Sequence, residues 1–164
     1  MKEKFVTLQP WFGLVARLTL GGVLFVAGYL KVGTPDKSQM AVRAYEMLPI
    51  SVANFLGLIL PPIEIVIGAL LMVGALTRVM AALGGFTMFV FIIAIAQAWA
   101  RGLNIDCGCF GGGGAVAPGE TKYLQEILRD IGLVFLAAYL IRYPLTKFSL
   151  DKNQNRKSSQ EEVA

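Results

Sequence analysis

Long apolar stretches separated by short polar connections dominate the chain. The first runs from Trp11 to Leu30 and is interrupted by Arg17 and Thr19. Others cover residues 54–76 and 79–100, and a fourth covers residues 123–143. A helix needs about 20 apolar residues to cross the hydrocarbon layer of a bilayer. The pattern therefore predicts an all-α, polytopic membrane protein built as a four-helix bundle.

The connection between the first two spans is expected to hold a short helix that lies at the membrane surface. Thr34 can cap this helix and Pro35 can occupy its first position, an arrangement that helices favour. Apolar residues then share one face, which suits an interfacial helix; they are Met40, Ala41, Ala44, Tyr45 and Leu48. Pro49 is expected to end it.

The second span contains Pro61 and Pro62. Proline lacks an amide donor and leaves a carbonyl one turn earlier without its partner, so a kink is predicted near Gly57 and Leu58. Residues 1–150 are expected to form one transmembrane domain. Residues 151–164 are polar and have the composition of a disordered tail.

Composition supports the membrane assignment and narrows the chemistry. Of the 164 residues, 55% are hydrophobic and 16% are charged, whereas soluble domains carry about 25% charged residues. The basic residues lie at the ends of apolar runs, as in membrane proteins, and do not suggest nucleic-acid binding. The chain has no histidine, which excludes imidazole-ligated metal sites and histidine acid–base catalysis.

The distribution of Lys and Arg predicts the orientation. With four spans, the side that holds both termini and the second connection carries eight Lys and Arg, against six in the first and third connections. Cytoplasmic segments carry the excess of these residues. We therefore expect cytoplasmic termini and an extracytoplasmic third connection, where disulfides persist.

The third connection contains the two cysteines of the chain, Cys107 and Cys109, within Asp106-Cys107-Gly108-Cys109-Phe110-Gly111. A disulfide that closes so small a loop contributes only about 1.6 kcal/mol of chain entropy and is strained, so it is a poor structural brace. Strained surface disulfides tend to be the exchanging kind. Structural zinc requires four ligands, and no metal site is expected, although two thiolates also suit copper(I).

Charged residues within the spans are a second candidate site. Glu64 lies 12 residues from the inner end of its helix and Asp130 lies 12 residues from Arg142, so both are expected about 18 Å above the inner surface. Lys31 and Arg129 can reach that level. The alternatives are a polar pocket below the cysteine loop, which passes protons or holds a quinone head group, and ion pairs that fix helix packing.

Arg17 is placed differently from these four residues. It lies about 9 Å along its helix from Trp11, and helical side chains lean toward the N-terminus. We therefore expect the Arg17 side chain to extend to the cytoplasmic surface. Arg17 and Asp106 are counted with the four residues above as the set that supports the polar pocket.

Several of these residues together resemble the MauE branch of the DoxX-like membrane proteins. The matching elements are Arg17 with Leu20-Gly21, Ala27-Gly28 with Lys31, Tyr45 with Leu48-Pro49, Leu60-Pro61 with Glu64 and Gly68, Arg101-Gly102, the loop from Asp106 to Gly111, and Arg129-Asp130. The resemblance implies a four-helix protein of the bacterial cytoplasmic (inner) membrane. It also implies support of periplasmic disulfides alongside a thioredoxin-like partner, and DoxX-like relatives link thiol chemistry to quinone.

We therefore interpret the chain as a membrane thiol–disulfide redox protein. Cys107 and Cys109 exchange disulfides with an extracytoplasmic, thioredoxin-like partner or client, and Asp106 adjoins them. One cysteine pair cannot relay electrons across a membrane, so they pass to a second protein or to quinone. Two alternatives stay open: a non-enzymatic scaffold for a soluble oxidoreductase, and a quinone- or solute-binding subunit that works through Glu64 and Asp130.

Overall fold

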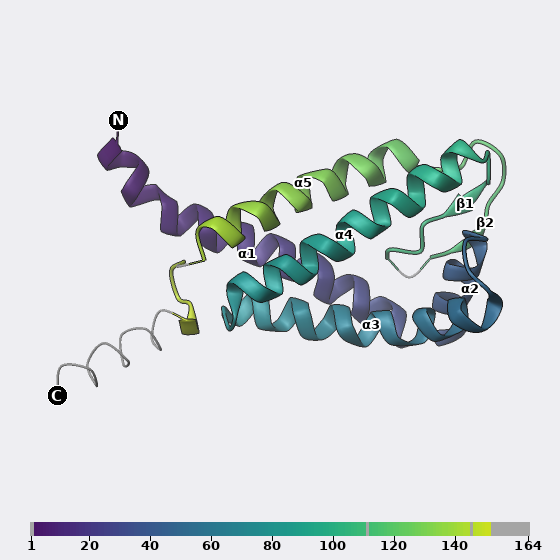
Figure 1. Ribbon diagram of the computed structural model, residues 1–164, viewed down its shortest axis with the longest axis horizontal. Coiled ribbons are helices and arrows are strands. Elements are labelled where there is room, and N and C mark those ends of the chain that lie inside the picture. Colours follow the sequence, from purple (N-terminus) through teal and green to yellow (C-terminus); the bar gives the residue numbers. More distant parts are fainter. Residues whose placement is uncertain (1, 111, 145, 152–164) are drawn as a thin grey trace.

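The protein is an elongated helical bundle with a small loop structure at one end (Figure 1). The computed structural model describes residues 2–110, 112–144 and 146–151, with side chains from residue 9 onward. The long helices are α1 (Lys2–Val32), α3 (Ile50–Val73), α4 (Thr77–Ala100) and α5 (Tyr123–Arg142). The short helix α2 (Pro35–Ala44) and the strands β1 (Ile105–Asp106) and β2 (Gly114–Ala115) lie together at one end. Helix α1 begins, and α5 ends, at the other end.

The predicted all-α membrane class is confirmed. Among the described residues, three helical segments are long and apolar enough to cross a membrane: Gln9–Val32 within α1, α3 and α4. Helix α5 is not among them, because Glu126, Arg129 and Asp130 all lie in its first half. The fourth crossing therefore stays a prediction, although α5 packs along α4 and contributes to the same core.

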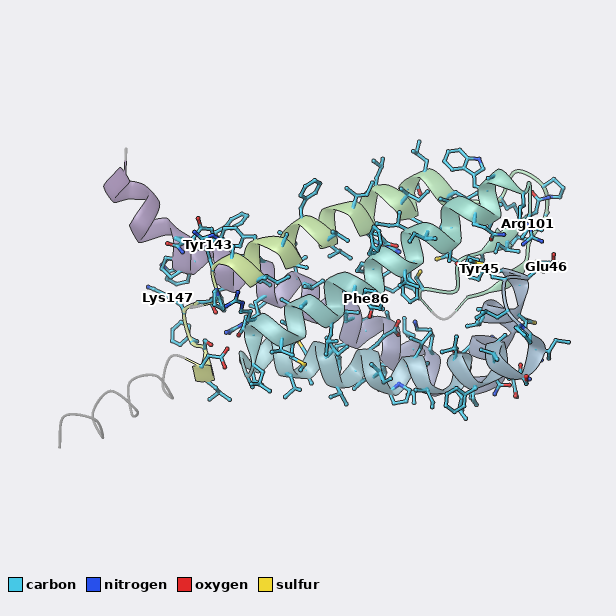
Figure 2. The ribbon with its side chains drawn as sticks, viewed as in Figure 1. Tyr45, Glu46, Phe86, Arg101, Tyr143 and Lys147 are labelled. Atoms are coloured by element: carbon cyan, nitrogen blue, oxygen red, sulfur yellow. The ribbon has the colours of Figure 1, made fainter. Side chains whose placement is uncertain are left out.

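Side chains are sorted as a bilayer requires. Small and aliphatic residues of the four long helices fill the interior, including Leu20, Leu71 and Ala137. Large apolar side chains point outward instead, as Phe86 on α4 does (Figure 2). Phe86 is 65% exposed, and Phe135 on α5 is 70% exposed. An exposed apolar surface of this extent is disfavoured in water and suits contact with lipid.

Helix α2 begins as predicted and ends earlier than predicted. Thr34 is its N-cap and Pro35 its first residue. The helix ends at Ala44, however, and Glu46 then adopts a left-handed conformation with φ of 50°. The prediction that Pro49 ends α2 is wrong: Pro49 is the N-cap of α3. Residues 45–49 lie between the two helices, and the chain reverses its direction there before α3 begins.

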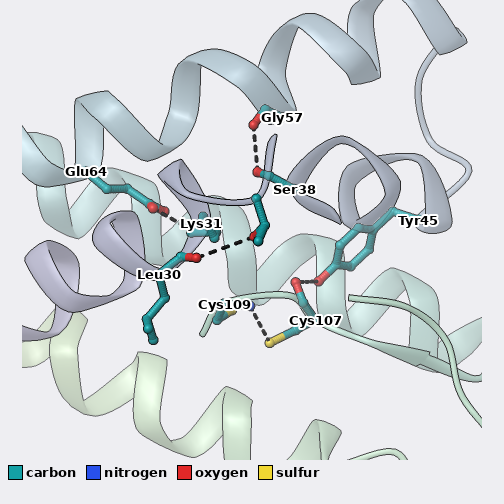
Figure 3. Close-up of polar contacts among 9 residues, drawn as sticks. Leu30, Lys31, Ser38, Tyr45, Gly57, Glu64, Cys107 and Cys109 are labelled. Atoms are coloured by element: carbon teal, nitrogen blue, oxygen red, sulfur yellow. Dashed lines mark hydrogen bonds and ion pairs between the residues drawn. The ribbon is translucent and has the colours of Figure 1, made fainter. Parts of the chain in front are cut away.

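A hydrogen bond between α2 and α3 compensates for a proline. Pro61 cannot donate to the Gly57 carbonyl, which is one turn earlier in α3. The Ser38 hydroxyl of α2 donates to this carbonyl at 2.6 Å, and Ser38 is buried (Figure 3). The sequence predicts the free carbonyl near Gly57 but not its partner. This contact fixes α2, and with it the wall of the cysteine loop, against α3.

We expect Ser38→Ala to lower the free energy of unfolding by about 1–3 kcal/mol, because the Gly57 carbonyl would stay buried without a donor. The measurement is the thermal unfolding midpoint of the purified protein in a mild detergent. Ser51→Ala is the matched control, since Ser51 is an exposed serine in the first turn of α3. Equal midpoints for the two variants would show that the Ser38 contact does not stabilise the fold.

At the opposite end, residues 146–151 form a strap across α1 and the α3–α4 turn. The Arg17 guanidinium donates to the Thr146 hydroxyl at 2.9 Å and to the Phe148 carbonyl at 3.2 Å. The Asp151 carboxylate accepts hydrogen bonds from the Leu76 and Thr77 amides, both at 2.8 Å, and so caps α4.

The contacts of residues 146–151 bear on two predictions, the position of the Arg17 side chain and the start of the C-terminal tail. The expectation that Arg17 extends to the aqueous surface is wrong, because Arg17 is only 1% exposed and is bonded within the strap. Asp151, placed in the predicted tail, belongs to this folded part; residues 152–164 of that tail lie outside the described residues.

Candidate functional site

Cys107 and Cys109 lie on the loop between β1 and β2, at the end of the bundle that also holds α2. The strands pair antiparallel, with Ile105 opposite Ala115 and Asp106 opposite Gly114. Both cysteines are free thiols and nearly buried, 9% and 6% exposed respectively. The Cys109 amide donates to the Cys107 sulfur at 3.3 Å (Figure 3). The two sulfurs are thus held on one tight turn.

Local hydrogen bonds set the shape of this turn. The Gly108 amide donates to the Asp106 carboxylate at 2.9 Å, a turn that places Asp106 beside the cysteines. Gly108 has φ of 69°, a conformation that glycine adopts without a steric cost. The Tyr45 hydroxyl donates to the Cys107 carbonyl at 3.1 Å (Figure 3). Burial, followed by the neighbouring thiols, raises the pKa of Tyr45, so its phenol keeps the donated proton.

Two further side chains fasten the loop to the helices. The Tyr123 hydroxyl donates to the Leu103 carbonyl at 2.5 Å and accepts from the Ile105 amide at 3.1 Å. Arg101 donates to the Tyr45 carbonyl at 3.2 Å and pairs with Glu46 at 3.0 Å (Figure 2). The Arg101–Glu46 pair is exposed and adds little stability. Its effect is to hold the segment that carries Tyr45.

Cys107 lies between two cavities. The outer cavity, of about 380 Å³, is open and lies between the loop and α5; its lining includes Asp106, Cys107, Phe110, Lys122, Glu126 and Arg129. The inner cavity, of about 40 Å³, lies between the loop and α1, α2 and α4; its lining includes Lys31, Ser38, Tyr45, Phe91, Cys107 and Cys109. Cys107 lines both cavities. Of these two cavities, Cys109 lines only the inner one.

The Lys31–Glu64 ion pair joins α1 to α3 on the inner side of the loop. The Lys31 Nζ atom is 2.5 Å from Glu64 Oε2, and the two side chains are 8% and 1% exposed (Figure 3). Lys31 also lies 5.6 Å from the centre of the Phe91 ring. The cation therefore lines the inner cavity while the carboxylate is buried behind it.

The Arg129–Asp130 pair lies on the outer side, on α5. Arg129 contacts the fully buried Asp130 carboxylate through Nε at 2.8 Å and through Nη2 at 2.7 Å. The guanidinium lies 5.0 Å from the Phe110 ring centre and is close enough to Cys109 to interact with it electrostatically. Because Arg129 and Asp130 are adjacent residues of one helix, the buried Asp130 carboxylate fixes the position of the Arg129 charge.

The structure thus divides the predicted polar pocket into two ion pairs on either side of the cysteine loop. Lys31 and Glu64 belong to the inner side, and Arg129, Asp130 and Asp106 to the outer side. Arg17 belongs to neither. It is 14 residues from Lys31 on the same helix, a distance of about 21 Å along the axis.

The environment favours the protonated form of the Cys107 thiol. The side-chain hydrogen bond with the Cys109 thiol, followed by burial, raises the pKa of Cys107, and the Glu126 carboxylate acts in the same direction, whereas the hydrogen bond from the Cys109 amide opposes the shift. The Cys107 sulfur is therefore poorly placed to carry a negative charge. This environment is not visible in the sequence, where both cysteines flank one glycine.

Sequence reasoning missed several residues of this site. Glu126 reaches the cysteine loop from α5, and Tyr45, Tyr123 and Ser38 hold the loop and its wall. The spacing of Glu126 ahead of Arg129 and Asp130, three and four residues, was the one available signal, because it places all three on one helix face. Tyr45 stood out only on the apolar face of the short helix and in the family resemblance, and Tyr123 gave no comparable signal.

One group near the cysteines has the composition of a metal site. Asp106, Cys107 and Glu126 each offer one ligand atom, and these atoms lie within 4.8 Å of one another. The set combines two hard oxygen ligands with one soft sulfur and supplies three ligands, whereas structural zinc sites use four. This geometry accommodates a cation without selecting one.

Comparisons with known proteins place the chain in a family. Neither the search of curated proteins nor that of solved structures finds a match. Residues 9–143 match the family described as "Methylamine utilisation protein MauE". The matched range includes α3, α4, α5 and most of α1, together with the cysteine loop and both ion pairs. By this match over most of its length, the chain belongs to the MauE family of membrane proteins, which is linked to methylamine utilisation.

Proposed function

We propose that this protein is a membrane thiol–disulfide exchange protein whose Cys107 and Cys109 alternate between dithiol and disulfide. One observation carries the proposal: two free thiols lie on the same tight turn, and one of them borders a cavity that is open to the outside of the protein. A thioredoxin-like protein, or a client protein with its own cysteines, is the partner that such a pair serves.

The local geometry suits exchange better than bracing. The loop is already fastened by the hairpin and by the Tyr45 and Tyr123 hydrogen bonds, so a disulfide adds little to its order. A disulfide across a single intervening residue is strained, which makes it more oxidising and more readily attacked. Gly108, with its left-handed backbone, gives the turn the freedom to close and reopen that bond.

We place the cysteine loop on the extracytoplasmic side of the bacterial cytoplasmic membrane. The Lys and Arg distribution supports this orientation, eight against six, and disulfides persist on that side. The family's link to methylamine utilisation favours a client in that metabolism. The trapping experiment below identifies the client directly.

The other electron carrier in the proposal is a second thiol protein. A quinone has less support at the inner cavity, whose volume of about 40 Å³ is far below the roughly 300–1,000 Å³ of ordinary ligand sites. By the usual measure of about 10–15 Å³ for each water, that cavity has room for about three waters. It therefore suits proton exchange with solvent better than binding of a ring.

The test is alkylation with a membrane-impermeant maleimide, read as a gel shift in intact cells. We expect no labelling before reduction and two labels after mild reduction. The Cys107→Ser/Cys109→Ser variant should be stably inserted and fail to maintain the disulfides of its client. In cells, at least one of the two single serine variants should form a mixed disulfide with the partner, which mass spectrometry then identifies.

Each alternative predicts a different result in the same strains. A non-enzymatic scaffold predicts that the double serine variant keeps its phenotype, and a solute subunit predicts loss of function in Glu64→Gln while the serine variants stay active. Labelling exclusively from the cytoplasmic side contradicts the proposed orientation, and a double serine variant with normal client disulfides contradicts the proposed function.

A further inference from the structure

We propose that the two cysteines have fixed, unequal roles: Cys107 is the sulfur that a partner thiolate attacks, and Cys109 is the leaving thiolate, which Arg129 stabilises. This assignment rests on the proposed exchange function. It follows from two independent features of the site, access to each sulfur and the charges that face it.

Access favours Cys107. It borders the open outer cavity of about 380 Å³, which is large enough to admit a side chain of a partner protein. Cys109 borders the inner cavity of about 40 Å³, which is walled by α1, α2 and α4. The two side chains are similarly buried, so the cavity each one borders, not its exposed area, separates them. A partner thiolate that enters between the loop and α5 meets the Cys107 sulfur.

The surrounding charges favour Cys109 as the leaving group. The Arg129 guanidinium lies 5.0 Å from the ring centre of Phe110, the residue that follows Cys109, and Asp130 holds it in place at 2.7–2.8 Å. Its positive charge acts on the Cys109 thiol from this position. Cys107 instead shares a cluster with the Asp106 and Glu126 carboxylates, within 4.8 Å. A nearby cation stabilises a thiolate and carboxylates oppose it. The negative charge released when the disulfide breaks is therefore better placed on Cys109.

The exchange step balances with these roles. The partner thiolate forms a bond with the Cys107 sulfur, the Cys107–Cys109 bond breaks, and its electron pair goes to the Cys109 sulfur beside Arg129. The second partner thiolate then attacks its own neighbouring sulfur and releases Cys107. Overall the partner is oxidised from dithiol to disulfide, and this chain gains two electrons and two protons, one proton on each cysteine. In the reverse reaction the Cys107 thiolate attacks the partner disulfide, and the Cys109 thiolate then attacks the Cys107 sulfur and releases the reduced partner.

The assignment is tested on the oxidised, full-length protein in detergent, with mercaptoethanesulfonate as the attacking thiol. The reaction is quenched in acid, the released cysteine is alkylated, and peptide mass spectrometry locates both modifications. We expect the probe on Cys107 and the alkyl group on Cys109, in excess over the reverse pattern by about tenfold. A probe found mainly on Cys109, or equally on both, overturns the assignment.

A second measurement tests the role of Arg129. Arg129→Met should slow the attack of the same probe on the oxidised protein by about tenfold, because the leaving thiolate loses its cation. Arg129→Lys keeps the charge and should retain most of the rate, which also guards against a folding defect. Arg78→Met, an exposed position at the start of α4, should react as the wild type does. Equal rates for all four proteins contradict the role of Arg129.

The two proposals fail in distinguishable ways. If the probe attaches to Cys109 but the double serine variant still loses client disulfides, the roles are wrong and the exchange function stands. If the probe attaches to Cys107 but the double serine variant keeps client disulfides, the sulfur chemistry is as assigned and the biological function is not disulfide exchange.

Discussion

Glu64→Gln is expected to lower the free energy of unfolding by about 3–5 kcal/mol, the usual cost of removing one partner of a buried ion pair. Lys31 and Glu64 are 2.5 Å apart and 8% and 1% exposed. The glutamine would leave the Lys31 charge within the bundle without a counter-charge. Thermal unfolding in a mild detergent, followed by size-exclusion chromatography, measures the loss.

The matched control replaces both partners at once. Because a buried pair stabilises little relative to apolar residues of similar size, Lys31→Met/Glu64→Leu should recover most of the lost stability. The double variant also separates packing from chemistry. If it is stable and still exchanges disulfides, the pair is a packing device; if it is stable and inactive, the charges take part in the reaction. Wild-type stability in Glu64→Gln alone would show that Lys31 does not need this carboxylate.

Gly68→Ala is expected to lower the free energy of unfolding by about 1–3 kcal/mol or more, the usual range for overpacking a core. A methyl group at Gly68 in α3 would lie 2.6 Å from the Gly21 carbonyl oxygen and 2.6 Å from the Phe25 amide nitrogen of α1. Both are backbone atoms, so no side chain can rotate away and the two helices must separate. Close helix contacts in membranes depend on such small residues.

The adjacent glycine of α1 provides the control. A methyl group at Gly22 would meet no atom within 4 Å. Alanine is favoured over glycine within a helix by about 1 kcal/mol, so Gly22→Ala should leave the unfolding midpoint unchanged or raise it. The two substitutions are chemically identical, and their opposite signs isolate the α1–α3 contact. Similar losses in both variants would indicate that this contact is looser than described.

The sequence was sufficient for the features that depend on local composition. Apolar length predicted the membrane class and the positions of the long helices, because a helix in lipid must satisfy its own backbone and present apolar side chains. Thr34 and Pro35 predicted the start of α2, because capping and the proline ring act within one turn. The free carbonyl near Gly57 was also predictable, since it follows from the missing amide of Pro61.

The sequence was insufficient where a residue's environment comes from another segment. Arg17 was expected to reach water, since its helix position alone allows it; the strap of residues 146–151 instead supplies its partners. Pro49 was expected to end α2, yet the chain reversal required an earlier end. Four charged residues were expected at one level, but which cation met which carboxylate depended on helix rotation.

The cysteine loop illustrates both cases. By itself the sequence determined that two thiols share one short glycine-containing turn beside apolar helices, because that follows from covalent spacing and hydropathy. Only the tertiary structure decided that Cys107 borders the open cavity, that Arg129 lies against Phe110 next to Cys109, and that Lys31 and Arg129 line different cavities. Access and electric field depend on which distant helices surround an atom, and a linear pattern does not contain that information.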